Sequence, residues 1–212
     1  SEQGKGGEGV TIFHFELKLL TPAFVAGSDK SMPEMRSASI RGELRYWLRA
    51  VIGVQETVPA QLFARERTVF GSTGGGSAVS VRIGPNIPKT DKYAMLPHRG
   101  TTRDQSWTPA LEAPQSFDLQ IVTLPGKALP NDLLTALQVW SLLGGIGRRS
   151  RRMFGAVQIV PKDRSEVAWY DPPAGTESLA QTTKSLLTRV AGPLAPPDTA
   201  APPDTAAPPD TA

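Results

Sequence analysis

At two places in the sequence, a segment of alternating apolar and polar residues is followed by a segment in which apolar residues recur at helical spacing. Residues 11–20 and 116–124 place apolar side chains at every second position, as half-buried strands do. Each is followed by a segment in which apolar residues recur at intervals of three and four, as in amphipathic helices. Each helix precedes a further short strand. The expected strands are residues 11–20, 77–83, 116–124 and 155–160, and the expected main helices are 39–53 and 131–143.

This order predicts an α+β fold of the ferredoxin-like (RRM-like) type, written βαββαβ, with both helices on one face of a four-stranded antiparallel sheet. The domain is expected over residues 11–160. Within it, residues 84–115 hold five prolines and no clear period, so they are expected to form a long loop insertion. Short helices are expected over residues 58–67 and 176–190.

Three segments are expected to lie outside this domain. Residues 1–10 are rich in glycine and glutamate, and residues 195–212 repeat the hexapeptide APPDTA three times. Such composition buries little apolar surface, so both ends are predicted to be disordered. Residues 161–194 are expected to form a peripheral extension.

The composition argues against several classes of site. The chain has no cysteine, which excludes disulfides and thiolate metal ligands, and only two histidines, so no metal or cofactor is expected. No apolar stretch reaches 18 residues, and the first residues lack a signal-peptide pattern. A cytoplasmic protein without membrane association is therefore expected.

The net charge of +3 conceals a strongly basic middle. Residues 31–160 carry 13 arginines, three lysines and nine carboxylates, whereas the segments on either side are acidic. Arginine presents a planar donor fork that suits phosphate. This distribution indicates a nucleic-acid-binding protein.

Three arginines recur every four residues along helix 39–53 and form one stripe. The expected anion site combines this stripe with residues at the start of the helix, where backbone N–H groups are free. Ser39 is the expected N-cap and Gly53 the expected C′ residue, just beyond the end of the helix. A stripe of this kind could also be only a solvated face. The expected RNA-binding residues here are Arg36, Ser39, Arg41, Arg45 and Arg49.

The sequence GGIGRRSRRMFG over residues 144–155 is the strongest candidate for phosphate binding. Its glycines allow positive φ and a close approach of the backbone to a partner, and its arginines supply phosphate contacts. A flexible loop with incidental charge is the alternative. The expected binding residues are Gly144, Gly145, Gly147, Arg148, Arg149, Ser150, Arg151 and Arg152.

Two further segments are weaker candidates. The run TVFGSTGGGSAV over residues 68–79 could cradle phosphate or be a simple hairpin link. In the insertion, Lys92, Arg99 and Arg103 interleave with aromatic residues, as in single-strand binders. No catalytic constellation is evident in the sequence.

Three motifs in order, MRSASIRGELRYWLRAVIG, LFARERTVFGST and GGIGRRSRRMFGAV, resemble the RAMP superfamily of CRISPR effector proteins. Among its members the pattern is most similar to the Cmr1-type, or terminal, subunits of type III-B Cmr complexes. The resemblance covers roughly residues 11–160. The members that it resembles are longer and have a second ferredoxin-like half.

The resemblance implies a non-catalytic, RNA-binding subunit of a ribonucleoprotein for antiviral defence. Its partners would be guide (CRISPR) RNA near the 3′ end, target RNA and other RAMP-type subunits. One alternative is an endoribonuclease, for guide processing or target cleavage, that uses His98 or Asp104 of the insertion. A weaker alternative is an adaptor whose arginines contact acidic protein surfaces.

Overall fold

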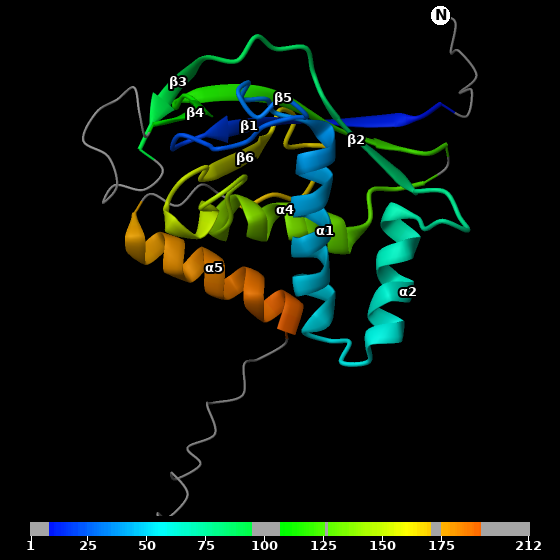
Figure 1. The fold of residues 1–212 in the computed structure, drawn as a ribbon. Helices are drawn as coiled ribbons and strands as arrows, with labels where there is room; N and C mark the ends of the chain where they lie inside the picture. Colours follow the sequence, from blue (N-terminus) through cyan, green and yellow to red (C-terminus); the bar gives the residue numbers. More distant parts are fainter. Residues whose placement is uncertain (1–8, 95–106, 126, 171–174, 192–212) are drawn as a thin grey trace, which may run out of the picture.

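The computed structural model describes residues 9–94, 107–125, 127–170 and 175–191. Of the segments expected to be disordered, 1–10 and 195–212, residues 1–8 and 195–212 lie outside the described residues, and Gly9 and Val10 belong to no helix or strand. In chain order the elements are β1 (Thr11–Leu19), α1 (Ser37–Gly53), α2 (Pro59–Phe70), β2 (Val79–Ile83), β3 (Thr90–Tyr93), β4 (Thr108–Leu111), β5 (Gln115–Thr123), α4 (Asn131–Leu143), the 3₁₀ turn η1 (Ser150–Arg152), β6 (Val157–Pro161) and α5 (Thr176–Ala191) (Figure 1).

The main sheet has four strands in the order β2-β5-β1-β6, and every neighbouring pair is antiparallel. β1 pairs with β5 along its whole length, from Thr11 opposite Thr123 to Leu19 opposite Gln115. The two central strands thus each begin one half of the chain. This is the ferredoxin-like topology that the sequence predicts, so the fold prediction is confirmed.

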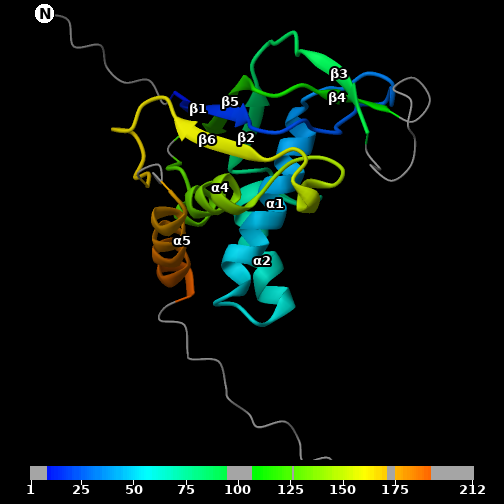
Figure 2. The ribbon, with the colours of Figure 1, turned by 90° about the vertical axis from the view of Figure 1, so that its left-hand side faces the viewer.

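The helices α1 and α4 cover one face of this sheet, and α5 and α2 lie farther from it on the same side (Figures 1 and 2). Phe15, Leu17 and Leu19 of β1 are fully buried under the helices, whereas the polar residues between them are partly exposed. Trp140 of α4 is the largest fully buried side chain of the shared core. None of the described helices is long and apolar enough to cross a lipid bilayer.

The insertion over residues 84–115 differs from the expected unpatterned loop, because it contains a second sheet. β3 pairs antiparallel with β4, from Thr90 opposite Leu111 to Tyr93 opposite Thr108. Leu111 is fully buried and exchanges two backbone hydrogen bonds with Ala23, of 2.9 and 3.0 Å. The insertion is therefore joined to the segment that follows β1.

The expected helix caps are wrong. α1 begins at Ser37, two residues before Ser39, and its N-cap position has no side-chain hydrogen bond. The Ser37 hydroxyl instead accepts a hydrogen bond from the backbone N–H of Ile83 (3.1 Å), which joins α1 to the end of β2. Gly53 is the last helical residue of α1, and Val54 occupies the cap position. The first turn of α1 is thus held by a contact with β2 and not by a capping side chain.

Candidate nucleic-acid interface

The glycine-rich loop, residues 144–155, connects α4 to β6. Gly147 and Gly155 have left-handed backbone angles, with φ of +86° and +66°. A Cβ atom on Gly147 would lie 2.7 Å from the carbonyl oxygen of Phe24, and one on Gly155 would lie 2.0 Å from that of Ile146. Both positions require glycine for contacts within the chain. The expected approach to a partner is not what makes these glycines necessary.

The glycine-rich loop is tied to the core near both of its ends, at residues 144–148 and at Gly155. The backbone N–H of Arg148 donates to the carbonyl of Phe24 (3.0 Å). The indole N–H of Trp140 donates to the carbonyl of Gly145 (3.1 Å). At Gly144, an added Cβ would lie 2.2 Å from the Trp140 ring. The loop backbone is thus held by the core beneath it.

The four arginines of the loop project from this fixed backbone. Arg148, Arg151 and Arg152 are exposed, and Arg149 is half-exposed. Within the described residues, none of these side chains has a hydrogen-bond or ion-pair partner. Arg149 also has a left-handed φ of +62°, which is strained for arginine. The fold therefore brings four positive charges close together without neutralising them.

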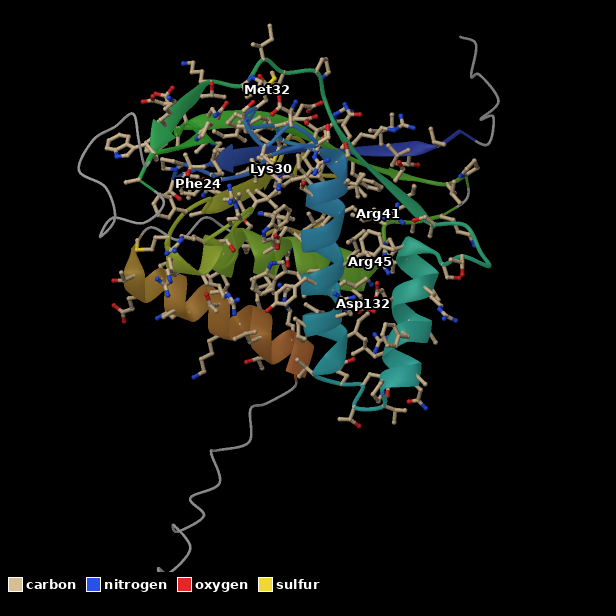
Figure 3. All side chains as sticks on the ribbon, viewed as in Figure 1. Phe24, Lys30, Met32, Arg41, Arg45 and Asp132 are labelled. Atoms are coloured by element: carbon tan, nitrogen blue, oxygen red, sulfur yellow. The ribbon has the colours of Figure 1, made fainter. Side chains whose placement is uncertain are left out.

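A groove of about 570 Å³ lies beside the loop. Its walls are the segment around Phe24 and Lys30, the first turns of α1 and the start of the glycine-rich loop (Figure 3). Lys30, Ser39 and Arg148 supply polar groups to it. At Gly42 an added Cβ would meet nothing within 4 Å, so the groove reaches the backbone of α1. The site is open, basic and partly apolar.

Glu43 also lines this groove and was not selected by the sequence analysis. Its carboxylate is half-buried and, among the described residues, has no ion-pair or hydrogen-bond partner. Burial raises the pKa of Glu43 above its usual value. The groove thus contains one destabilised negative charge.

The arginine stripe of α1 contacts the neighbouring helix α2. Arg45 Nε lies 2.5 Å from one carboxylate oxygen of Glu66, and Arg49 Nη1 lies 3.4 Å from the other. Arg41 donates to the carbonyl of Phe70 at the end of α2. Glu66 is 2% exposed, whereas its two arginine partners are about 40% exposed. The stripe is thus a clamp between helices and not only a solvated face.

Glu66 is a second residue that the sequence analysis did not select. The run LFARER does not indicate that Glu66 is buried, because positive and negative residues alternate there. Only the packing of α2 on α1 shows that a single buried carboxylate faces two guanidinium groups. The pair of arginines therefore keeps an excess positive charge at this surface.

The remaining expected residues are dispersed. Lys92 is exposed on β3. Ser150 is half-buried, and its Cβ would lie 3.2 Å from a Cβ added at Gly145. Arg36 precedes α1, and its Nε is buried without a hydrogen-bond partner in the described structure. The other expected residues of the insertion, Arg99 and Arg103 for RNA binding and His98 and Asp104 for the enzyme alternative, lie outside the described residues.

The face of the sheet opposite the helices is polar. Asp118 on this face accepts hydrogen bonds from Lys162 (2.5 Å) and Gln120 (2.7 Å), and His14 lies 3.8 Å from it. The outward positions of the four strands carry no Phe, Tyr or Trp. Across the part of the chain that the structure covers, no group of three or more metal-ligating side chains is present.

A family model described as the RAMP superfamily matches residues 16–158. Among curated proteins, the CRISPR system Cmr subunit Cmr1-2 of Pyrococcus furiosus is 41% identical over 70 residues, which are 32% of this chain and 37% of that protein. The Cmr1-1 subunit of the same organism is 30% identical over 174 residues, covering 70% of this chain and 48% of that protein. The chain thus spans less than half the length of these curated relatives.

Solved structures share the fold. The crystal structure of apo Cmr1 from Pyrococcus furiosus matches 84% of this chain and 60% of its own, with a TM-score of 0.58 and 22% identity. A cryo-EM structure of the type III-B Cmr-beta complex bound to cognate target RNA contains a chain matching 86% of this one and 63% of its own, with a TM-score of 0.57 and 15% identity. At these identities the structural likeness concerns the fold alone.

Proposed function

The chain belongs to the RAMP superfamily, and on this premise we propose that it is a non-catalytic, RNA-binding subunit of a type III CRISPR ribonucleoprotein effector. Its curated relatives are subunits of the Cmr system, and one structural neighbour belongs to a complex bound to target RNA. The proposed partners are the guide RNA close to its 3′ end, complementary target RNA and other RAMP-type subunits.

The observation that carries the proposal is the glycine-rich loop, whose four arginine side chains have no partner among the residues that the structure describes. Guanidinium groups without intramolecular partners keep all their donors for an external anion. Phosphate oxygens suit them because the planar fork can bind two oxygens at once. A loop whose backbone is held by the core also loses little backbone entropy when it binds.

The proposed RNA path runs from this loop into the adjacent groove. Arg148 and Lys30 would contact phosphates, and Ser39 in the first turn of α1 offers a hydroxyl beside them. Arg36 and Lys92 would extend the contact toward the insertion. The clamped arginines 41, 45 and 49 would act through the exposed parts of their guanidinium groups.

The contacts proposed here read the RNA backbone and not its bases. An RRM-type domain stacks bases on aromatic side chains of its sheet, and the outward strand positions here offer none. Phosphate contacts position a strand without sequence information. Affinity should therefore depend strongly on salt and weakly on RNA sequence.

The test is fluorescence anisotropy of a labelled single-stranded RNA titrated with the protein at several salt concentrations. Replacing Arg151 and Arg152 together with alanine should weaken binding of unrelated RNA sequences equally. It should also reduce the slope of log K against log salt by about 1.4, at ~0.7 per phosphate contact. The matched control replaces Arg82 and Lys184, which are exposed elsewhere and carry the same charge.

Two outcomes would contradict the proposal. Unchanged RNA affinity in the folded Arg151/Arg152 variant would remove the loop from the interface. Cleavage of the RNA in the same samples without added metal would favour the endoribonuclease alternative. Intact RNA with salt-sensitive retention is the result expected for a binding subunit.

A further inference from the structure

A second groove, of about 550 Å³, lies on the other side of α1, between this helix and α2. Arg41 and Arg45 enter it from α1, Arg67 enters it from α2, and the turn over residues 71–77 closes it. Figure 3 shows Arg41 and Arg45 on the side of α1 that faces α2, away from Lys30 and Phe24. The groove is thus separate from the one beside the glycine-rich loop.

The second groove has an excess of positive charge. It contains three guanidinium groups and one carboxylate, that of Glu66. Glu66 is also shared with Arg49, so it does not neutralise Arg45 alone. Arg67 is exposed and has no side-chain partner within the described residues. Arg41 and Arg45 each retain donors beyond the contacts that hold them in place.

The turn beside these arginines contains glycines that packing does not explain. Gly71 has a φ of +70°, and its added Cβ would lie 2.7 Å from the backbone of Gly76, so the fold requires glycine there. Gly74, Gly75 and Gly76 have no left-handed φ, and an added Cβ at each would meet nothing within 4 Å. These three residues leave the backbone of the turn uncovered, and Gly75 among them lines the groove.

One feature opposes anion binding, and the structure offsets it. The carboxyl end of α2 faces this groove, and the carbonyl end of a helix repels anions. Arg41 donates to the terminal carbonyl of Phe70, and its guanidinium lies 5.4 Å from the centre of the Phe70 ring. This cation covers the negative end of the helix.

We infer that the groove between α1 and α2 is a second binding site for the phosphodiester backbone of a single RNA strand, an inference that rests on the proposed function. A phosphate group would bind the exposed guanidinium donors of Arg41, Arg45 and Arg67 and approach the backbone at Gly75. A phosphodiester presents two free oxygens to guanidinium groups from two helices, and the bare backbone at Gly75 lets it approach closely. The two grooves would hold RNA on both sides of α1.

The test uses two variants that should leave the fold intact. Arg67→Gln removes an unpaired charge, and the triple change of Gly74, Gly75 and Gly76 to alanine fills open space without backbone strain. Each should weaken binding of a labelled single-stranded RNA, with a loss of roughly threefold to tenfold for one charged contact. Arg67→Gln should also lower the salt slope by about 0.7. Thermal melts establish that both variants are folded.

Arg65→Gln is the matched control on the same helix. Arg65 pairs with Asp132 at 2.7 Å and does not line the groove, so its loss should leave RNA affinity unchanged. Wild-type affinity in either groove variant, or an equal loss in the control, would overturn the inference. Groove variants that retain RNA affinity but fail to assemble with other effector subunits would make the groove a protein site and overturn it too.

The Arg151/Arg152 variant separates this inference from the proposed function. If wild-type protein binds RNA and that variant weakens binding while both groove variants do not, the second groove fails together with the contacts proposed for Arg41 and Arg45, and the glycine-rich loop remains the RNA site. If the wild-type protein does not retain RNA, both proposals fail together.

Discussion

Replacing Gly147 with alanine tests whether the glycine-rich loop is built by internal packing. The new Cβ would lie 2.6 Å from Val25 Cγ1 and 2.7 Å from the Phe24 carbonyl oxygen, at a φ of +86°. The left-handed conformation costs an alanine about 1–2 kcal/mol, and overpacking costs about 1–3 kcal/mol. The free energy of unfolding should therefore fall by about 2–5 kcal/mol.

The measurement is urea denaturation followed by circular dichroism, supported by thermal melts. For a chain of this size, each kcal/mol corresponds to a change of about 2–4 °C in Tm. The matched control is Gly42→Ala, at a helical position with no atom within 4 Å of the new Cβ. It should raise the free energy of unfolding by about 0.5–1 kcal/mol because alanine favours the helix.

A Gly147→Ala variant as stable as the wild type would refute this reasoning. It would mean that the segment containing Phe24 moves away at no cost, and that the backbone hydrogen bond between Phe24 and Arg148 does not fix the loop. A destabilised variant that keeps full RNA affinity below its melting temperature would leave the packing argument intact. It would show that RNA binding tolerates a shifted loop.

Three further predictions concern charged groups. Glu43→Gln should tighten RNA binding about twofold to fivefold at neutral pH by removing one charge. Because burial raises the pKa of Glu43, this advantage should shrink in anisotropy titrations as the pH is lowered and the wild-type carboxyl protonates. The hydrogen bond from Lys162 lowers the pKa of Asp118 below 3.8, so its stabilisation should be present above that pH and lost as the pH falls further. Asp118→Asn should remove this part of the acid dependence in urea titrations. Arg45→Gln should lower the free energy of unfolding by about 1–3 kcal/mol, because the buried Glu66 loses its closest partner, and an unchanged urea midpoint would contradict the clamp.

Local periodicity was sufficient to predict the main fold. The alternation of Phe15, Leu17 and Leu19 identifies the buried face of β1, and the helical spacing of Ile40 and Leu44 identifies that of α1. These patterns depend on neighbours within a few residues. They are therefore readable without knowing what packs against them.

The features that sequence did not reveal depend on distant partners. Pro109 lies within β4, and proline argues against a strand, so the hairpin of the insertion was hidden. The role of Gly147 depends on Phe24, more than one hundred residues away. Glu66 pairs with Arg45 and Arg49 only when α2 packs on α1. No local sequence pattern encodes these contacts between distant residues.

Part of the basic surface is joined through backbone hydrogen bonds. Leu111 pairs with Ala23, and the next residue, Phe24, pairs with Arg148, so segments from three regions of the chain are linked by amide hydrogen bonds. Amides are the same whatever side chain they carry. Over evolutionary time, or in a laboratory library, exposed cations here could be exchanged while the outline of the surface persists. The charge of the surface and its backbone shape would then vary independently, so related chains of very different charge could keep the same backbone shape.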